Sequence, residues 1–194
     1  PFQCKIQSFL IRRLFVVTLI NIPILEFVAK PNHLFSKKWL LLTSGNYSLG
    51  QYNAMTISWG SIGEIWAKPF IQVVVRPTRH TFGFMEEYPT FTVCAFPEEY
   101  HSALALLGSK SGRDGNKIKE SGLTPEPSLA VAAPGYIEAE LILECRKIYW
   151  QDLEPNQFLD PEIETHYSRK DYHRIYFGEI LSIRGTDAYY QNEQ

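Results

Sequence analysis

The segment 137–149 constrains the fold more than any other part of this sequence, because its side chains alternate in character. Its apolar series is Ile137, Ala139, Leu141, Leu143 and Cys145, and its charged series is Glu138, Glu140, Glu144 and Arg146, with Ile142 as an exception. Successive side chains of a strand point to opposite faces, so this strand should bury one face and leave the other in water. Such alternation is typical of antiparallel sheets, and we predict one here.

Five other segments have the apolar, β-branched or aromatic composition of strands, namely 38–43, 53–60, 68–76, 90–96 and 172–183. In the last of them we expect one shared face, formed by His173, Ile175, Phe177, Leu181 and Ile183. Helices are predicted at 78–88, with Thr78 as the N-cap, and after Pro97. The glycine-containing segments 44–46 and 60–63 are predicted loops.

The order of these elements predicts a mainly β protein with short helices. Strands do not alternate with long helices, and there is no G-x-G-x-x-G, which argues against a dinucleotide-binding Rossmann fold. A closed or half-closed antiparallel barrel of about six or seven strands, with helices at its ends, fits this order.

Size, charge and cysteine usage narrow the function classes. With 194 residues, 45% of them hydrophobic, the chain can form one domain with a buried core. A formal net charge of −2 gives no basic field, so no nucleic-acid partner is expected. The cysteines (Cys4, Cys94, Cys145) and the histidines lack metal-site spacing, so no metal is expected either. Sparse cysteines favour buried thiols in a reducing compartment, and we expect a cytoplasmic protein.

The N-terminal segment 1–30 has a character of its own. Residues 9–29 are strongly apolar, but charged residues and Pro23 leave an uninterrupted apolar stretch only at about 14–25. Since roughly 20 residues are needed to cross a bilayer, we predict no membrane span. Three interpretations stay open: secondary structure packed on the domain or a partner, a non-native or wrongly assigned start, and a targeting segment, against which the missing cleavage site counts.

The strand 53–60 has an unusual second face. One face carries Asn53, Met55, Ile57 and Trp59, of which Met55 and Ile57 should face the core, and the other carries Ala54, Thr56 and Ser58. A small, hydroxyl-bearing face lets a flat ligand approach the backbone and be held by hydrogen bonds. A half-exposed strand whose polar face meets water explains the same pattern.

Three further features of the sequence could contribute to a binding site for an anionic group or for a flat ring. The strand 68–76 runs directly into a helix start that carries Arg79 and His80, and helix N-termini favour phosphate. The segment 109–117 combines glycines with three cations, Lys110, Arg113 and Lys117. His173 stands in register with apolar residues. Each feature also has a plainer explanation. The helix start would be an ordinary solvated first turn, the segment 109–117 a solvated loop, and His173 a core histidine.

Taken in order, five stretches of the sequence resemble one family. They are N-A-M-T-I-S-W-G, R-P-T-R-H-T, F-T-V-C-A-F-P-E-E-Y, G-S-K-S-G-R-D with K-I-K-E-S-G-L-T-P, and D-Y-H-R-I-Y-F-G-E-I. This order resembles the flavin reductase-like, FMN-binding split-barrel family, and within it the flavoredoxin-like members. The resemblance runs from about Leu34 to Ile183. We therefore expect that domain at 31–185, the apolar segment 1–30 outside it, and a polar, frayed tail at 186–194.

The resemblance implies a six-stranded antiparallel split barrel, a homodimer, and FMN bound near the dimer interface. It also implies an oxidoreductase, namely an NAD(P)H-dependent flavin reductase that passes electrons from NAD(P)H to flavin, or through bound FMN to an acceptor. The alternative is a non-enzymatic, FMN-holding electron carrier that docks with other redox proteins. Because the flavin carries the chemistry, no catalytic side chain is expected, and His173 is the one candidate.

Carried over residue by residue, the resemblance assigns cofactor contacts to three segments. The first contains Asn53, Ala54, Met55, Thr56, Ser58 and Trp59. The second contains Arg79, His80 and Thr81, and the third, a loop that closes over the cofactor, contains Ser109, Arg113 and Lys117. We expect Thr56, Ser58 and the helix start at Thr78 to hold the phosphate or the ring edge, and Trp59 to pack near the ring.

Overall fold

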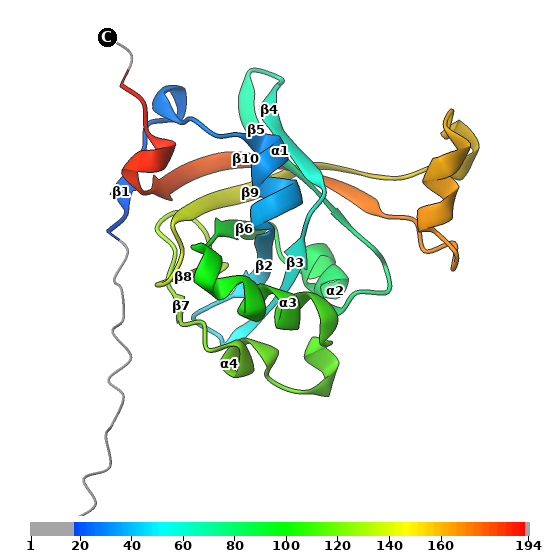
Figure 1. Cartoon of the computed structure of the whole chain (residues 1–194), viewed down its shortest axis with the longest axis horizontal. Coiled ribbons are helices and arrows are strands. Elements are labelled where there is room, and N and C mark those ends of the chain that lie inside the picture. Colours follow the sequence, from blue (N-terminus) through cyan, green and yellow to red (C-terminus); the bar gives the residue numbers. More distant parts are fainter. Residues whose placement is uncertain (1–17, 193–194) are drawn as a thin grey trace, which may run out of the picture.

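The computed structural model describes residues 18–192, and its centre is one antiparallel sheet (Figure 1). The strand order is β3-β2-β6-β9-β10-β5-β4, and the short β1 pairs with the end of β10. The bounds are β1 Ile20–Asn21, β2 Leu40–Asn46, β3 Gln51–Ile57, β4 Gly60–Ile65, β5 Lys68–Val75, β6 Thr90–Ala95, β9 Leu141–Asp152 and β10 Arg174–Gly185. A separate ribbon pairs β7 Pro125–Glu126 with β8 Gly135–Tyr136. The predicted mainly β, antiparallel class is confirmed.

The sheet curls into a barrel that stays open along one line. β3 and β4 lie at opposite edges of the strand order, yet only Ser58 and Trp59 separate them in the sequence. The chain therefore brings the two edges close together, while the described strands form no ladder between β3 and β4. This arrangement is the predicted split barrel.

Within residues 18–192 the main sheet has eight strands, whereas the resemblance implied six. One of the unexpected strands is β4, at a segment predicted to be a loop. β4 returns to β5 through Trp66 and Ala67, which both have a φ of 54°. Tight hairpin turns need two positive φ angles, and Asn or Gly usually supplies them. Because Trp66-Ala67 contains neither Asn nor Gly, this hairpin could not be predicted from the sequence. The predicted loop 44–46 is also wrong, since it completes β2.

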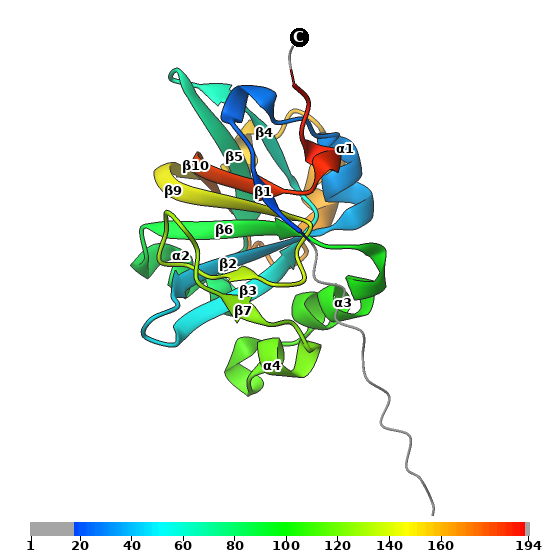
Figure 2. The same cartoon turned by 90° about the vertical axis from the view of Figure 1, so that its left-hand side faces the viewer.

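The barrel wall is buried on both sides where β2 and β3 run. Met55 and Ile57 belong to the core inside the barrel, as predicted. On the outer side, α3 (His101–Ser109) and α4 (Lys117–Ser121) cover β2 and β3 (Figure 2). Ala54 is fully buried in this second core. The small face of β3 is therefore covered by a helix at Ala54 and partly at Thr56, and only its end at Ser58 is exposed, as the plainer interpretation expected for the whole face.

The helix after β5 starts later than predicted. α2 spans His80–Glu87. Thr78 is not its N-cap, since the Thr78 hydroxyl donates to Asp171 Oδ2 at 3.2 Å. Arg79 occupies the N-cap position and its side chain makes no capping hydrogen bond. The first backbone N–H groups of α2 therefore have no side-chain cap.

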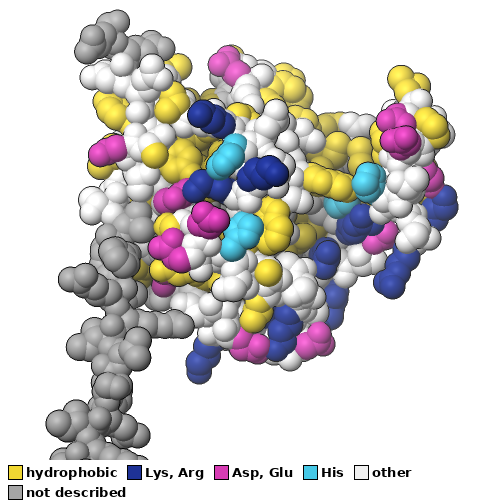
Figure 3. Space-filling model, in the orientation of Figure 1, with side chains coloured by type: hydrophobic (Ala, Val, Ile, Leu, Met, Phe, Trp, Pro, Cys, Tyr) yellow, Lys and Arg dark blue, Asp and Glu magenta, His cyan; other side chains and the backbone are white. Residues whose placement is uncertain are grey.

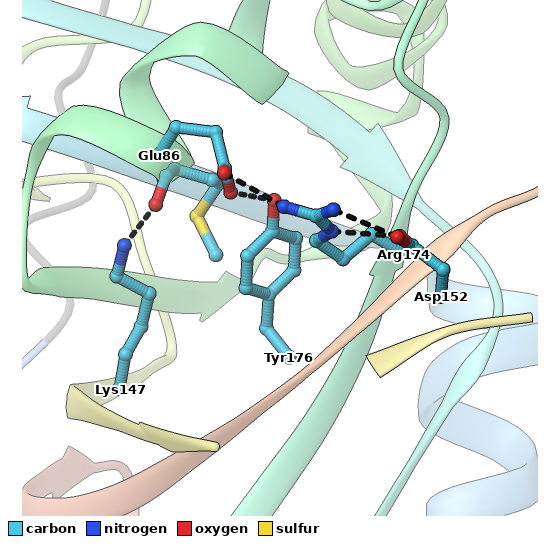
Figure 4. Close-up of polar contacts among 6 residues, drawn as sticks. Glu86, Lys147, Asp152, Arg174 and Tyr176 are labelled. Atoms are coloured by element: carbon cyan, nitrogen blue, oxygen red, sulfur yellow. Dashed lines mark hydrogen bonds and ion pairs between the residues drawn. The ribbon is translucent and has the colours of Figure 1, made fainter. Parts of the chain in front are cut away.

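The other end of α2 is fixed to the sheet by a polar cluster (Figure 4). Glu86 accepts hydrogen bonds from the Tyr176 hydroxyl at 2.6 Å and from Arg174 Nη1 at 2.7 Å. Arg174 also makes two hydrogen bonds with Asp152, at 2.7 and 2.8 Å. Because Asp152 lies on β9 and Arg174 on β10, this cluster joins the helix to two central strands.

β9 differs from the prediction at its start. Residues 137–140 form a turn, so the strand begins at Leu141. Glu138 and Glu144 were expected in water but are 3% and 0% exposed. The segment 124–130 folds over this face, and its backbone N–H groups donate to both carboxylates. A buried carboxylate requires such donors, which a strand pattern does not show.

The predicted single face of the last strand is wrong. β10 has register shifts against β9 after Phe177 and after Ile180. An extra residue reverses which side chains face inward. Tyr176 and Ile180 are therefore buried and Leu181 is 40% exposed, so of the predicted face only His173 and Ile183 are buried.

Both ends of the described chain pack on the barrel. β1 extends the edge of β10, and Ile22 is buried. Tyr189 is 7% exposed and donates a hydrogen bond to Glu140 at 2.6 Å, so the prediction of a frayed tail is wrong for residues 187–189. What the sequence led us to expect of residues 1–17 falls outside the described residues. None of the described helices has the length and apolarity needed to cross a membrane.

Candidate functional site

A positively charged cavity of about 160 Å³ lies between the start of α2 and the segment 107–117. Its basic residues are Arg79, Lys110, Arg113 and Lys117, and among the described residues that line it none is Asp or Glu. On the surface of α4, by contrast, basic and acidic side chains are mixed (Figure 3). We call this space the cationic cavity. Lys110 is paired with Glu120 of α4 at 2.5 Å, so the cations without a carboxylate partner among the described residues are Arg79, Arg113 and Lys117, and they favour a negatively charged ligand.

Lys117 is the most enclosed of these cations, with 4% of its surface exposed. Its ammonium group donates to the backbone carbonyls of Leu107 at 2.8 Å and Lys110 at 2.9 Å. Burial, followed by the positive charge of Arg79, lowers the pKa of Lys117 to about 8. A bound anion would relieve both effects, because it supplies the counter-charge that the cavity lacks.

Arg79 and Arg113 are exposed and contact only backbone oxygens. Arg79 Nη1 lies 3.3 Å from the carbonyl oxygen of Gly108, and Arg113 Nη1 lies 3.4 Å from that of Thr78. Within residues 18–192 neither arginine forms an ion pair with a carboxylate. Both guanidinium groups are therefore available to a bidentate anionic ligand such as phosphate.

Gly112 brings the segment 109–117 into close contact with β3 and α2. A Cβ atom at Gly112 would stand 2.2 Å from Asn53 Oδ1 and 2.9 Å from His80 Cδ2, so only glycine fits. Asn53 in turn donates to the Thr81 hydroxyl oxygen at 2.7 Å, and both residues are buried. This contact fixes β3 to α2 beneath the cavity.

A second cavity of about 210 Å³ lies where β3 and β5 end, and we call it the strand-end cavity. Met55 and Arg79 line both this cavity and the cationic cavity, so the two adjoin. Trp59 forms one wall and is 44% exposed. The Thr56 hydroxyl donates to the carbonyl of Leu104 on α3 at 2.5 Å, so its proton is already committed. A flat apolar group fits beside Met55 and Trp59.

His173 closes the strand-end cavity on the β10 side. It is 8% exposed, and its Nδ1 lies 2.8 Å from the Tyr167 hydroxyl. Burial, and then the positive charge of Arg76, lower the pKa of His173 to about 4. The imidazole is therefore neutral at pH 7, and it offers hydrogen bonds there rather than a positive charge.

A third cavity of about 560 Å³ adjoins the cationic cavity on its other side. His80, Gly112 and Lys117 line both spaces. Aromatic side chains contribute to its walls, so we call it the aromatic cavity; they are Tyr52 of β3, Phe84 of α2 and Tyr88, which directly follows α2. Burial, then Arg113 and Lys117, lower the pKa of His80 at this junction, so its imidazole is neutral at pH 7.

The structure brings together most of the residues that the resemblance assigned to the cofactor. The cationic cavity is lined by Arg79, His80, Thr81, Ser109, Arg113 and Lys117. The strand-end cavity is lined by Met55, Thr56, Ser58, Trp59 and His173, and the aromatic cavity by Asn53. Ala54 does not join them, because its side chain is buried beneath α3 and is not accessible to a ligand.

Other lining residues were not assigned to the cofactor. Arg76, the first residue of the stretch R-P-T-R-H-T, directly follows β5 and lines the strand-end cavity. By helical spacing Phe84, Met85 and Tyr88 share one face, yet of these three only Met85 belongs to the barrel core, and the two aromatic side chains line a cavity. A helical period shows which residues share a face but does not show what that face meets.

Comparisons with known proteins agree with this geometry. Residues 33–193 match the model of the family described as flavin reductase like domain. An uncharacterised protein of Pyrococcus abyssi is 25% identical over 152 residues, which are 77% of this chain and 74% of that protein.

Two solved structures are similar in fold. One is an FMN-binding domain of a flavin reductases-like enzyme from Shewanella baltica, with a TM-score of 0.62, 17% identity, and coverage of 87% of this chain and 77% of that chain. The other is the flavoredoxin of Desulfovibrio vulgaris, with a TM-score of 0.61, 21% identity, and coverage of 80% and 73%. Since the family match spans most of the sequence, this chain belongs to the flavin reductase-like domain family.

Proposed function

We propose that this protein binds FMN across the strand-end and cationic cavities and works as an NAD(P)H-dependent flavin reductase. The observation that carries the proposal is the cationic cavity itself. Four basic residues line it, none of its described lining residues is acidic, and it adjoins a cavity walled by Met55 and Trp59. A ligand with a phosphate at one end and a flat ring at the other matches this pair of cavities.

The residues present fit the phosphate of FMN. Arg79 and Arg113 have no carboxylate partner among the described residues, and Lys117 already lies against the cavity with a lowered pKa. The uncapped start of α2 adds backbone N–H groups and the positive end of the helix dipole. Together these groups would hold a dianionic phosphate without any metal ion.

The residues of the strand-end cavity fit the ring of the flavin. When bound, the flavin supplies the hydride and electron transfer chemistry. Met55 and Trp59 offer apolar contact, and Ser58 stands exposed at the mouth of the cavity. Arg79 places positive charge in the same space, which favours negative charge on a ring edge, whereas Arg76 is paired with Asp171 at 2.8 Å. His173 is neutral at pH 7 and would shape this space by packing and hydrogen bonding.

A second subunit is part of the proposal. The strand-end cavity is open beside the exposed Trp59, whose ring lies 5.2 Å from that of His166. His166 belongs to the segment 153–172, which projects from the barrel and offers an extended surface (Figure 1). The family resemblance implies a homodimer with FMN near the interface. Sedimentation of the full chain with and without FMN should show a dimer, and a monomer in both states would contradict this part.

Anaerobic stopped-flow absorbance tests the reductase directly. The protein is loaded with FMN and mixed with NADH or NADPH, and we expect the flavin absorption band to bleach with one of them. An FMN-loaded protein that bleaches with neither donor would instead support the FMN-holding electron carrier, which the likeness to flavoredoxin keeps as the second candidate. A protein that remains colourless after incubation with FMN would contradict both.

A further inference from the structure

We propose that the aromatic cavity binds the adenylate half of FAD, so that this protein prefers FAD to FMN. The inference rests on the proposed function, because it takes the cationic cavity as the seat of the flavin phosphate. Its starting point is a space that FMN leaves unused. The aromatic cavity, at about 560 Å³, is larger than the other two together, which measure about 210 and 160 Å³.

The three cavities follow one another in the order in which a flavin dinucleotide is built. Met55 and Arg79 are shared by the strand-end and cationic cavities, and His80, Gly112 and Lys117 are shared by the cationic and aromatic cavities. The cationic cavity therefore lies between the other two. FMN ends at its phosphate, whereas FAD continues from that phosphate into a second phosphate, a ribose and an adenine. A ligand that continues from the cationic cavity across the contact between His80 and Gly112 would reach the aromatic cavity.

The aromatic cavity offers a surface for a purine. The rings of Phe84 and Tyr88 are inclined by only 15°, with centroids 6.1 Å apart, so they form one continuous wall. The Tyr88 hydroxyl donates to Gln51 Oε1 at 2.9 Å, which holds that ring in place. His80 meets Phe84 edge-on at 5.3 Å and extends the wall toward the cationic cavity. Bases stack on such aromatic faces.

The polar groups around this cavity match the remaining parts of an adenylate. Lys117 and the neutral His80 stand at the junction, where the second phosphate would lie. Among the described residues that line the aromatic cavity, Glu87 alone is acidic, and it lies at the far end of α2 from the cationic cavity. A carboxylate there accepts hydrogen bonds from the ribose hydroxyls, which carry no charge.

Isothermal titration of the full, flavin-free chain with FMN and with FAD tests the assignment. We expect FAD to bind at least about tenfold more tightly than FMN, because base stacking adds to the shared contacts. Tyr88→Ala and Phe84→Ala should each weaken FAD binding by about tenfold and change FMN binding by less than about twofold. Tyr88→Phe should retain the FAD affinity, since it keeps the ring.

The controls separate this assignment from other occupants. Tyr149→Ala removes a tyrosine that lines none of the three cavities and should change neither affinity. Phe84→Leu keeps an apolar side chain without the aromatic face, so it covers the case in which the alanine variant fails to fold. Equal affinity for the two flavins would overturn the adenylate assignment, and so would variants that change only the KM for NADH. Absence of binding by both flavins would overturn the proposed function itself.

Discussion

Two arginines beside the two ends of α2, Arg79 at its start and Arg174 of β10 at its end, have different partners. At its end, Arg174 makes three hydrogen bonds to the carboxylates of Glu86 and Asp152, and its guanidinium lies 3.8 Å from the centre of the Trp150 ring. At its start, Arg79 has one backbone oxygen at 3.3 Å and no carboxylate partner among the described residues. Arginine is therefore paired with carboxylates, which we call saturated, beside one end of this eight-residue helix. At the other end it is unsaturated, with no carboxylate partner among the described residues.

This difference separates a structural charge from a binding charge. Arg174 holds elements together, because each of its three guanidinium nitrogens donates to a carboxylate within the fold. An unsaturated arginine beside a cavity without acids adds little to stability, and its donors are available to a ligand. Variants at the end of α2 should therefore change the free energy of unfolding. Variants at its start should change the flavin affinity.

The largest effect is expected for Arg174→Ala. The change removes three charged hydrogen bonds from a side chain that is 15% exposed and leaves the Tyr176–Glu86 pair without its cation. We expect a loss of about 2–3 kcal/mol in the free energy of unfolding, measured by urea denaturation. FMN affinity should change by less than about twofold, once the protein is folded. A large loss of FMN affinity with unchanged stability would reverse the comparison.

An acidic residue placed in the cationic cavity should convert the start of α2 into a saturated site. Ser109 is exposed at the end of α3, lines this cavity, and bonds only carbonyls of its own helix. Ser109→Asp should pair with the cations and repel phosphate, which weakens FMN binding by about tenfold. Ser102→Asp adds the same charge to an exposed position of the same helix outside the cavities, and it should leave the affinity unchanged. Equal losses in the two variants would point to net charge alone.

How much of the fold was predictable differs between its regular and irregular parts. Strands such as 68–76 and 90–96 could be predicted, because runs of β-branched and aromatic residues are typical of strands. The hairpin at Trp66-Ala67 and the register shifts between β9 and β10 were not predicted, since both depend on backbone angles that these residue types do not signal. The buried Glu144 was placed in water because its donors come from backbone N–H groups about 15 residues away.

The candidate site was predictable to the extent that ordered family motifs carry it. Arg79 and Lys117 were selected from segments about 40 residues apart and line one cavity. Ala54 and the Thr56 hydroxyl were expected to face a ligand, but α3 covers the first and accepts the proton of the second. Which layer covers a strand face is a tertiary property, and the alternation of small residues on β3 suits a ligand and a helix equally well.

Arg79→Ala should weaken FMN binding by at least several-fold. Loss of one charged hydrogen bond to phosphate usually costs over about 1 kcal/mol, and the melting temperature should be nearly unchanged, since Arg79 has no carboxylate partner to lose. Lys119→Ala is the matched control, because it removes one positive charge from exposed α4 outside the cavity. Fluorescence titration with FMN measures both. Unchanged affinity in Arg79→Ala would remove this residue from the phosphate seat.

The smallest effect, and the finest test of the comparison, is the pH dependence due to Lys117. Its pKa of about 8 in the free protein means that raising the pH from about 7 to about 9 removes its charge, so FMN affinity should fall by about threefold to fivefold. Lys117→Arg keeps the charge and should flatten this profile. The stability contribution has the opposite sign. Between about 8 and the ordinary value of 10.5 the unfolded chain holds the extra proton, so the free energy of unfolding rises with pH there. An affinity that falls while stability rises, both through Lys117, is what a binding charge predicts and a structural charge does not.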